Sequence, residues 1–200
     1  MIMISELRLE VYIMEKLILE LFGRIKDLEE RVDKLESEKN LETNIKKVTR
    51  KTSRDYTIRK LQEKNEGLYA KKGNKIIKAD IILSLDGKDL KAKYFHSKSY
   101  SEAFPAGWYT INIDDIKQNS YDLYIFCLYY KDEFKTFLFT KKDIEEIIEK
   151  KPMDTNNNYH FYIHIKEDGR ILECRDSDID ISKTYEDWTL PKRIIDGLER

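Results

Sequence analysis

Residues 79–98 read ADIILSLDGKDLKAKYFHSK, and this stretch decides the fold. Two extended runs flank the dipeptide Asp86-Gly87. Asp-Gly between two such runs favours a tight turn with positive φ, so we predict a β-hairpin. The second arm of the hairpin changes to polar residues from His96 to Ser99, just before a loop. Such a strand end is either a solvated terminus or a place where side chains do chemistry.

The chain after this hairpin alternates strand and helix signals. The run YDLYIFCLYY at 121–130 has no charge after its second residue, which suits a central strand covered on both faces. Thr140 and Asp143 form a capping-box pattern at the start of a helix that Pro152 ends. Further strands are predicted at 107–116, 134–139, 159–165 and 171–176, and a short helix at 190–200. Five or six strands with a few helices indicate an α/β fold with a mixed β-sheet flanked by helices.

Residues 1–40, upstream of the hairpin, carry a heptad repeat. Position a is β-branched in all five heptads and position d is Leu in four of five, a choice that favours two parallel strands. The a residues are Ile4, Val11, Ile18, Ile25 and Val32, and the d residues are Leu7, Met14, Leu21, Leu28 and Leu35. We predict a long coiled-coil helix that forms a parallel homodimer through residues 4–38. A single amphipathic helix docked on its own domain, or pairing with a different chain, are the alternatives.

Residues 41–77 are rich in Lys and Arg and poor in apolar residues. We predict a basic linker and the first helix of the following domain, from about Arg54 to Leu68 with Ser53 as its cap. One interpretation is a solvated helix. The other is a patch that contacts nucleic-acid phosphates, because the charges cluster while the whole chain is nearly neutral. The candidate contacts are Lys46, Lys47, Arg50, Lys51 and Arg54.

The composition limits the classes of protein that this chain can belong to. It has 200 residues, 37 basic and 38 acidic side chains and a net charge of −1, so only a local patch can attract a polyanion. Two cysteines, Cys127 and Cys174, cannot form a disulfide framework. No apolar run reaches the roughly 18 residues that span a bilayer. We therefore expect a cytoplasmic protein without membrane contact.

Several kinds of site are not indicated by the sequence. His160 and His164 lie on one side of a predicted strand, but about 13 Å separates them, too far to share a zinc ion. An alternation of aromatic and polar side chains on the surface explains this pair better. No glycine-rich phosphate loop and no GxSxG nucleophile elbow occurs in the chain.

One group of residues that could take part in catalysis remains, at the hairpin itself. Asp80 begins the first arm, and Lys98 closes the second. Metal-dependent phosphodiester hydrolysis needs carboxylates that hold Mg²⁺ against the scissile phosphate. It also uses a lysine that positions water or offsets developing charge. We therefore expect Asp80 and Lys98 to converge on one phosphate-sized hollow.

The stretch ADIILSLDGKDLKAKYFHSKS resembles the core hairpin of the PD-(D/E)xK restriction-endonuclease-like superfamily. Members of that family show an Asp on one strand and (D/E/Q)-x-K at the close of the next, and the resemblance extends over about residues 54–190. It implies a restriction-endonuclease-like core at 78–200 and a Mg²⁺ cofactor. The site residues that it implies are Asp80, His96 and Lys98 for catalysis, Asp80, Glu63 and Glu66 for the metal, and Ser97 and Ser99 for contact with phosphate.

The motif departs from the family at His96, which stands where the family has an acidic residue or Gln. A histidine brings no negative charge and suits Mg²⁺ poorly. Asp89-Leu90-Lys91 is a literal D-x-K in an alternative register. Two functions follow as hypotheses. One is a dimeric, Mg²⁺-dependent, DNA-processing nuclease. The other is an inactive nuclease-fold or scaffold protein that acts in DNA binding or in protein assembly through its coiled coil.

Overall fold

The computed structural model describes residue 31 and residues 48–74, 76–117 and 121–198. The chain divides into two compact units, residues 1–47 and residues 48–200. The heptad segment 4–38, apart from Arg31, lies outside the described residues, and so do Lys46 and Lys47. The described helices and strands all belong to the second unit, apart from Arg31.

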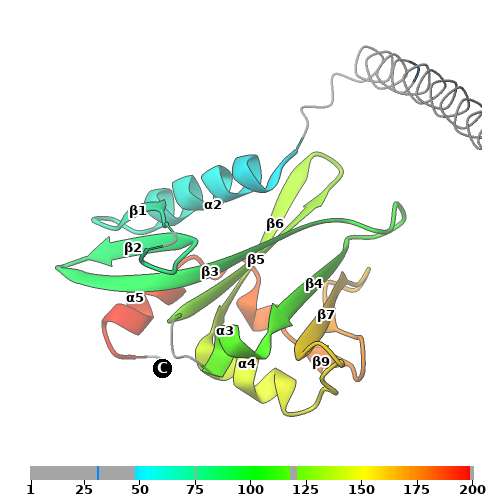
Figure 1. Cartoon of the computed structure of the whole chain (residues 1–200). Helices are drawn as coiled ribbons and strands as arrows, with labels where there is room; N and C mark the ends of the chain where they lie inside the picture. The colour runs from blue at the N-terminus through cyan, green and yellow to red at the C-terminus, as the bar shows by residue number, and fades with distance from the viewer. Residues whose placement is uncertain (1–30, 32–47, 75, 118–120, 199–200) are drawn as a thin grey trace, which may run out of the picture. The chain divides into compact units, whose positions relative to one another are not determined.

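A mixed five-stranded sheet forms the centre of this unit (Figure 1). Its order is β1-β2-β3-β5-β6, and only the β3–β5 pair is parallel. The strands are β1 (Tyr69–Lys72), β2 (Ile81–Leu85), β3 (Lys88–Lys98), β5 (Leu123–Tyr130) and β6 (Glu133–Thr140). The expectation of an α/β fold with a mixed sheet is confirmed.

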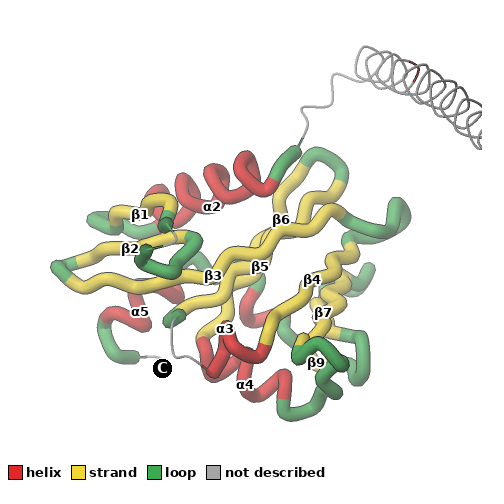
Figure 2. Tube along the Cα trace, viewed as in Figure 1, coloured by secondary structure: helices red, strands yellow, loops and turns green. Residues whose placement is uncertain are grey.

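A second, antiparallel sheet of four strands packs beside the first (Figure 2). Its order is β4-β7-β8-β9. The strands are β4 (Ala106–Asn112), β7 (Asn158–Ile165), β8 (Ile171–Glu173) and β9 (Ile179–Asp180). The sequence predicted one sheet of five or six strands, and this is corrected to nine strands in two sheets within the described ranges. β4 leaves the first sheet because it pairs with β7, far along the chain.

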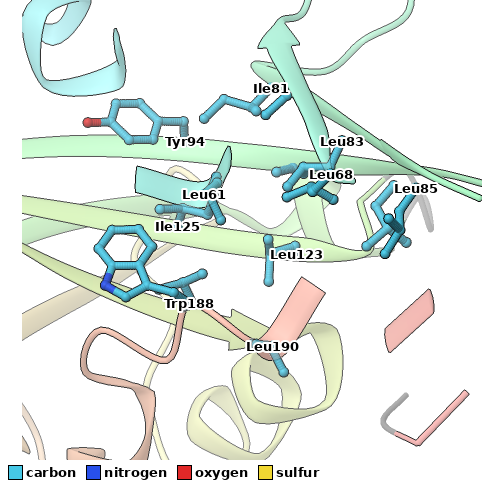
Figure 3. Close-up of a cluster of buried hydrophobic side chains, with 14 of the residues drawn as sticks. Leu61, Leu68, Ile81, Leu83, Leu85, Tyr94, Leu123, Ile125, Trp188 and Leu190 are labelled. Carbon is cyan, nitrogen blue, oxygen red and sulfur yellow. The ribbon is translucent and has the colours of Figure 1, made fainter. Parts of the chain in front are cut away.

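Helices and two hydrophobic cores cover both faces of the central sheet. On one face α2 (Arg50–Lys64) and α5 (Leu190–Ile195) pack over it, and Leu61, Leu190 and Trp188 fill the space between (Figure 3). On the other face lie α3 (Ile113–Lys117), α4 (Lys141–Ile148) and the second sheet. A short 3-10 helix, η1 (Ser182–Thr184), precedes α5. None of the helices in the described ranges has the length and apolar character needed to cross a membrane.

Local signals of the sequence are confirmed at three places. Asp86 and Gly87 have φ of 51° and 76°, which is the positive-φ turn expected between β2 and β3. Thr140 and Asp143 form the reciprocal capping box that starts α4. Six successive residues of β5, from Leu123 to Leu128, are buried, because β5 lies between β3 and β6 and is covered on both faces.

The start of α2 differs from the prediction. The helix begins at Arg50, and Thr49 is its cap, with a hydroxyl that accepts the Thr52 N–H. Ser53, the predicted cap, is buried inside the first turns and donates to the Arg50 carbonyl. The chain offers Ser or Thr at several neighbouring positions, so composition alone does not choose between them.

Candidate functional site

Asp80 lies immediately before β2, where that strand starts to pair with β3. Its backbone N–H donates to the Ala92 carbonyl. Its carboxylate accepts the Tyr94 N–H at 3.1 Å and forms an ion pair with Arg50 at 3.0 Å. Arg50 also donates to the Tyr94 carbonyl at 2.6 Å. Asp80 and Arg50 together therefore bond the main chain of β3 at Tyr94, the position that a continued β2 would have paired.

Lys98 does not meet Asp80. The register pairs Ile81 with Ala92, which sets Asp80 opposite Lys93. From Lys93 to Lys98 the strand advances by roughly 16 Å at about 3.3 Å per residue. The two side chains also line different hollows of the surface. The expected convergence of Asp80 and Lys98 is thus not found, because the hairpin register brings a different lysine to the acid.

His96 is half-buried on β3, between these two positions. Burial lowers the pKa of its imidazole, and the positive charges of Lys98 and Arg50 lower it further. Its Nδ1 is buried and has no hydrogen-bond partner among the described residues. A neutral ring beside two cations cannot replace the missing carboxylate of the family motif.

A basic hollow of about 470 Å³ opens beside Asp80. Four of its lining side chains are cationic and one is acidic. The lining consists of Arg54, Lys72, Gly73, Asn74, Lys78, Ala79, Asp80, Lys93 and Tyr121. Only 8% of Arg54 is exposed, and its Nε is buried without a hydrogen-bond partner in the described part of the chain. A buried N–H without a partner is costly, and among the described residues the Arg54 Nε has none, while the side chain borders a hollow with room for a ligand.

Lys93, which lines this hollow, is held in place by neighbouring side chains. Its Nζ contacts the Asp115 carboxylate of α3 at 2.8 Å and lies 5.1 Å from the centre of the Tyr121 ring. Burial acts to lower the pKa of Lys93, but the hydrogen bond and charge of Asp115 outweigh it and raise the pKa. Lys93 therefore keeps its positive charge at neutral pH. The sequence did not single out this lysine, although the hairpin register points to it.

The residues predicted to hold Mg²⁺ do not assemble here. Glu63 pairs with Lys60 and Arg59 on the exposed side of α2, and about 20 Å of helix separates it from Arg50. Glu66 is exposed beyond the end of the helix. The Asp80 oxygens already accept from Arg50 and from the Tyr94 N–H. No three His, Cys, Asp or Glu side chains of the described ranges gather closely enough to hold a metal ion. This donor set does not fit a Mg²⁺ site.

The other predicted contact residues take several different roles. Lys51 is exposed on the first turn of α2. The Ser97 hydroxyl donates to the Lys98 carbonyl and accepts the Trp108 N–H. The Ser99 hydroxyl donates to the Ser101 carbonyl and accepts the Ala106 N–H. These two serines thus fix the loop between β3 and β4.

A second feature of the surface lies on the outer side of the four-stranded sheet. We call it the aromatic face, and it consists of Tyr100, Phe104, Trp108, His160, Tyr162 and His164. Trp108 on β4 is opposite Tyr162 on β7, and their ring centres are 5.4 Å apart. The alternation of 159–165 indicated the β7 part of this face. The β4 and loop parts depend on strand pairing, which the sequence did not predict.

The resemblance to the PD-(D/E)xK superfamily rests on the sequence of the hairpin. The geometry replaces Lys98 by Lys93 as the lysine beside Asp80 and adds Arg54 to the same hollow. Comparison of the chain with protein-family models, with curated proteins and with solved structures finds no match.

Proposed function

We propose that this protein binds DNA, and that the basic hollow beside Asp80 takes phosphates of the DNA backbone. The observation that carries the proposal is Arg54, a buried arginine with an unpaired Nε that lines a hollow shared with three lysines. Guanidinium groups bind phosphate through paired hydrogen bonds, and charged hydrogen bonds of this kind are stronger than neutral ones. A phosphate at this position would supply the partner that the Arg54 Nε lacks.

The charges around Arg54 favour a polyanion over a single small acid. Lys72 and Lys78 are exposed at the rim, while Lys93 and Arg54 lie deeper. The chain as a whole carries a net charge of −1, so this excess of cations is local. A clustered patch on a nearly neutral protein is the electrostatic footprint expected of a backbone-binding site.

Fluorescence anisotropy with labelled DNA over a series of salt concentrations tests this proposal. The double variant Lys72→Gln/Lys78→Gln should weaken binding and should lower the slope of log K against log salt by about 2, since each lost phosphate contact removes about 1. Lys142→Gln/Lys192→Gln is the matched control, because both lysines are exposed on helices away from the hollow. Equal slopes for the two double variants would contradict the proposal, as would a parent protein that does not bind DNA.

Phosphodiester hydrolysis at the same hollow is the second candidate function. The observation that favours it is that Asp80 and Lys93 line one hollow, an acid and a lysine together as the family resemblance requires. Plasmid cleavage in Mg²⁺ or Mn²⁺ tests it. Cleavage that is lost in Asp80→Asn and in Lys93→Met and kept in Lys98→Ala would support hydrolysis with Lys93 as the lysine. DNA that is bound and left intact would leave binding as the function.

The parallel homodimer through residues 4–38 is part of the same proposal. Two linked domains would raise the effective concentration of the second domain at DNA once the first has bound. The molar mass of the full chain by light scattering should be twice that of the monomer, and Leu21→Glu at a d position should reduce it to the monomer. A monomeric parent chain would remove the dimer from the proposal. A cytoplasmic location remains a prediction of the sequence.

A further inference from the structure

The aromatic face exposes three large rings on one side of the second sheet. Trp108 is 52% exposed, Tyr100 is 53% exposed and Phe104 is 37% exposed. Single exposed apolar side chains are common on protein surfaces, but here Trp108 comes from β4 and Tyr100 and Phe104 from the loop before it, and the three lie together. A cluster of exposed rings of this kind indicates a ligand-binding or interaction surface.

Hydrogen bonds and ring contacts within the protein already hold several rings of this face. The Tyr100 hydroxyl is hydrogen-bonded to Nε2 of His164, and the Phe104 and His164 ring centres are 5.2 Å apart. His160 bonds the Thr110 hydroxyl with Nδ1 at 3.0 Å and the Asp154 carboxylate with Nε2 at 2.9 Å. Because little ordering remains to be done, binding loses little conformational entropy.

The ionisable groups beside the rings limit the groups that this face can receive. Burial lowers the pKa of His164, and the charge of Lys166 lowers it further, so its ring is neutral at physiological pH. Arg175 lies 5.0 Å from the Tyr162 ring centre and is near Asp176. Flat, uncharged groups with polar edges therefore suit the face, and nucleobases have this character.

The position of β3 connects the face to the basic hollow. Lys93 at the hollow and Ser97 against the Trp108 N–H belong to the same strand and point to the same side of the sheet. About 13 Å of strand separates them. A few nucleotides cover that length, since stacked bases advance by about 3.4 Å each. β3 thus borders both the hollow and β4, and we take one strand of nucleic acid to occupy both surfaces.

We propose that the aromatic face stacks unpaired bases, so that the nucleic acid bound by this protein is single-stranded at this point. The inference rests on the proposed function, because it assumes that the phosphates of the same strand occupy the basic hollow. A duplex hides the faces of its bases by stacking, whereas a single strand presents them to aromatic side chains.

Tryptophan fluorescence of the full-length protein tests the inference, since the chain has two tryptophans. Trp108 is exposed, while Trp188 is only 7% exposed in the first core and supplies an unquenched background. Single-stranded oligothymidylate should quench the emission of Trp108 and bind more tightly than a duplex of equal length. Anisotropy should show a loss of about tenfold in single-strand affinity for Trp108→Ala and for Tyr162→Ala. Trp108→Phe should keep most of the affinity.

Tyr69→Ala is the matched control, because Tyr69 is an exposed tyrosine on β1, outside the aromatic face. Unchanged Trp188 emission in Trp108→Ala and Trp108→Phe, and unchanged far-UV circular dichroism in Tyr162→Ala and Tyr69→Ala, confirm that the fold is kept. Single-strand affinity that is equal in Trp108→Ala, Tyr162→Ala and Tyr69→Ala would overturn the inference. If DNA binding then still depends on Lys72 and Lys78, the proposed function stands without it. Quenching by an uncharged oligosaccharide and not by oligothymidylate would also overturn it, by assigning the face to a sugar.

Discussion

Two cations of this domain are buried, and their surroundings differ. The Lys151 side chain has no exposed area, and its Nζ contacts the carboxylates of Glu173 at 2.8 Å and Asp176 at 2.9 Å. Arg54 is buried almost as deeply, but its Nε has no partner within the described ranges, and it opens on a hollow lined by three further cations. The protein itself supplies ion-pair partners for Lys151, whereas the Arg54 Nε has none among the described residues.

The difference separates a structural charge from one available to a ligand. Burial of a charge costs free energy unless it is paired and hydrogen-bonded, and Lys151 meets this condition inside the fold. Glu173 in turn accepts the Tyr162 N–H, so the pair is tied to β7. Within the described ranges the Arg54 Nε does not meet this condition. We therefore expect changes at Lys151 to affect stability and changes at Arg54 to affect binding.

The largest effect is expected when the completed pair is broken. Lys151→Met leaves the buried Glu173 carboxylate without its cation and should lower the free energy of unfolding by about 3–5 kcal/mol, measured by urea denaturation. The double variant Lys151→Met/Glu173→Met removes both charges and should recover part of this loss. A single variant as stable as the parent would show that the pair contributes nothing.

Arg54→Met should affect DNA binding and not stability, unlike Lys151→Met. DNA affinity should fall about tenfold or more, since one hydrogen bond to a charged group is worth about 1.5–3 kcal/mol. The free energy of unfolding should stay the same or rise, because an unpaired buried charge is removed. Arg54→Lys keeps a charge and should lose less affinity. A variant that unfolds easily and binds as before would make Arg54 structural, like Lys151.

A smaller effect is expected at Asp143, an anion whose partners all come from the protein. Asp143 accepts the Thr140 N–H and hydroxyl, and its other oxygen contacts Lys183 at 2.7 Å. Burial opposes ionisation, but these bonds outweigh it and lower the pKa of Asp143. Asp143→Ala should cost about 1–2 kcal/mol at pH 7. Because the pKa is lowered in the folded state, the stabilisation exists above about pH 4 and is lost as pH falls through the folded pKa. Denaturation at several pH values measures this difference.

The smallest effect concerns the half-buried imidazole of His96. Its pKa is lowered on folding, so below about pH 6.5 the unfolded chain binds a proton that the folded chain does not. The free energy of unfolding should therefore decrease as pH falls from 6.5 through the lower folded pKa. His96→Gln should flatten this dependence between about pH 7 and pH 5.5. Identical slopes for parent and variant would show that folding does not lower the pKa of His96.

The sequence predicted the features that neighbouring residues determine on their own. The Asp86-Gly87 turn, the apolar run of β5 and the Thr140–Asp143 cap each lie within a few residues, and each is confirmed. Features that depend on distant pairing were not predicted. β4 joins β7 rather than the central sheet, which assembles the aromatic face.

The candidate site also depends on pairing between distant residues, which the sequence did not predict. Asp80 and the polar end of β3 were both correctly placed near strand ends, yet the choice of Lys98 requires knowledge of the register. Each residue of an antiparallel partner faces one position only, and for Asp80 that position is Lys93. The role of Arg54 depends on packing of α2 against the hairpin, which no local motif records.

β3 continues for six residues beyond Ala92, the last of its residues that pairs with β2. From Lys93 to Lys98 the strand pairs with β5 on one side and with no strand of the described ranges on the other. Open strand edges recruit foreign strands and begin aggregates. At Tyr94 the carboxylate of Asp80 and the guanidinium of Arg50 already occupy the main-chain groups that an intruding strand would need. We therefore expect these two side chains to oppose edge-to-edge pairing, and their loss should first show in concentrated protein, as particles that scatter light while each domain is still folded.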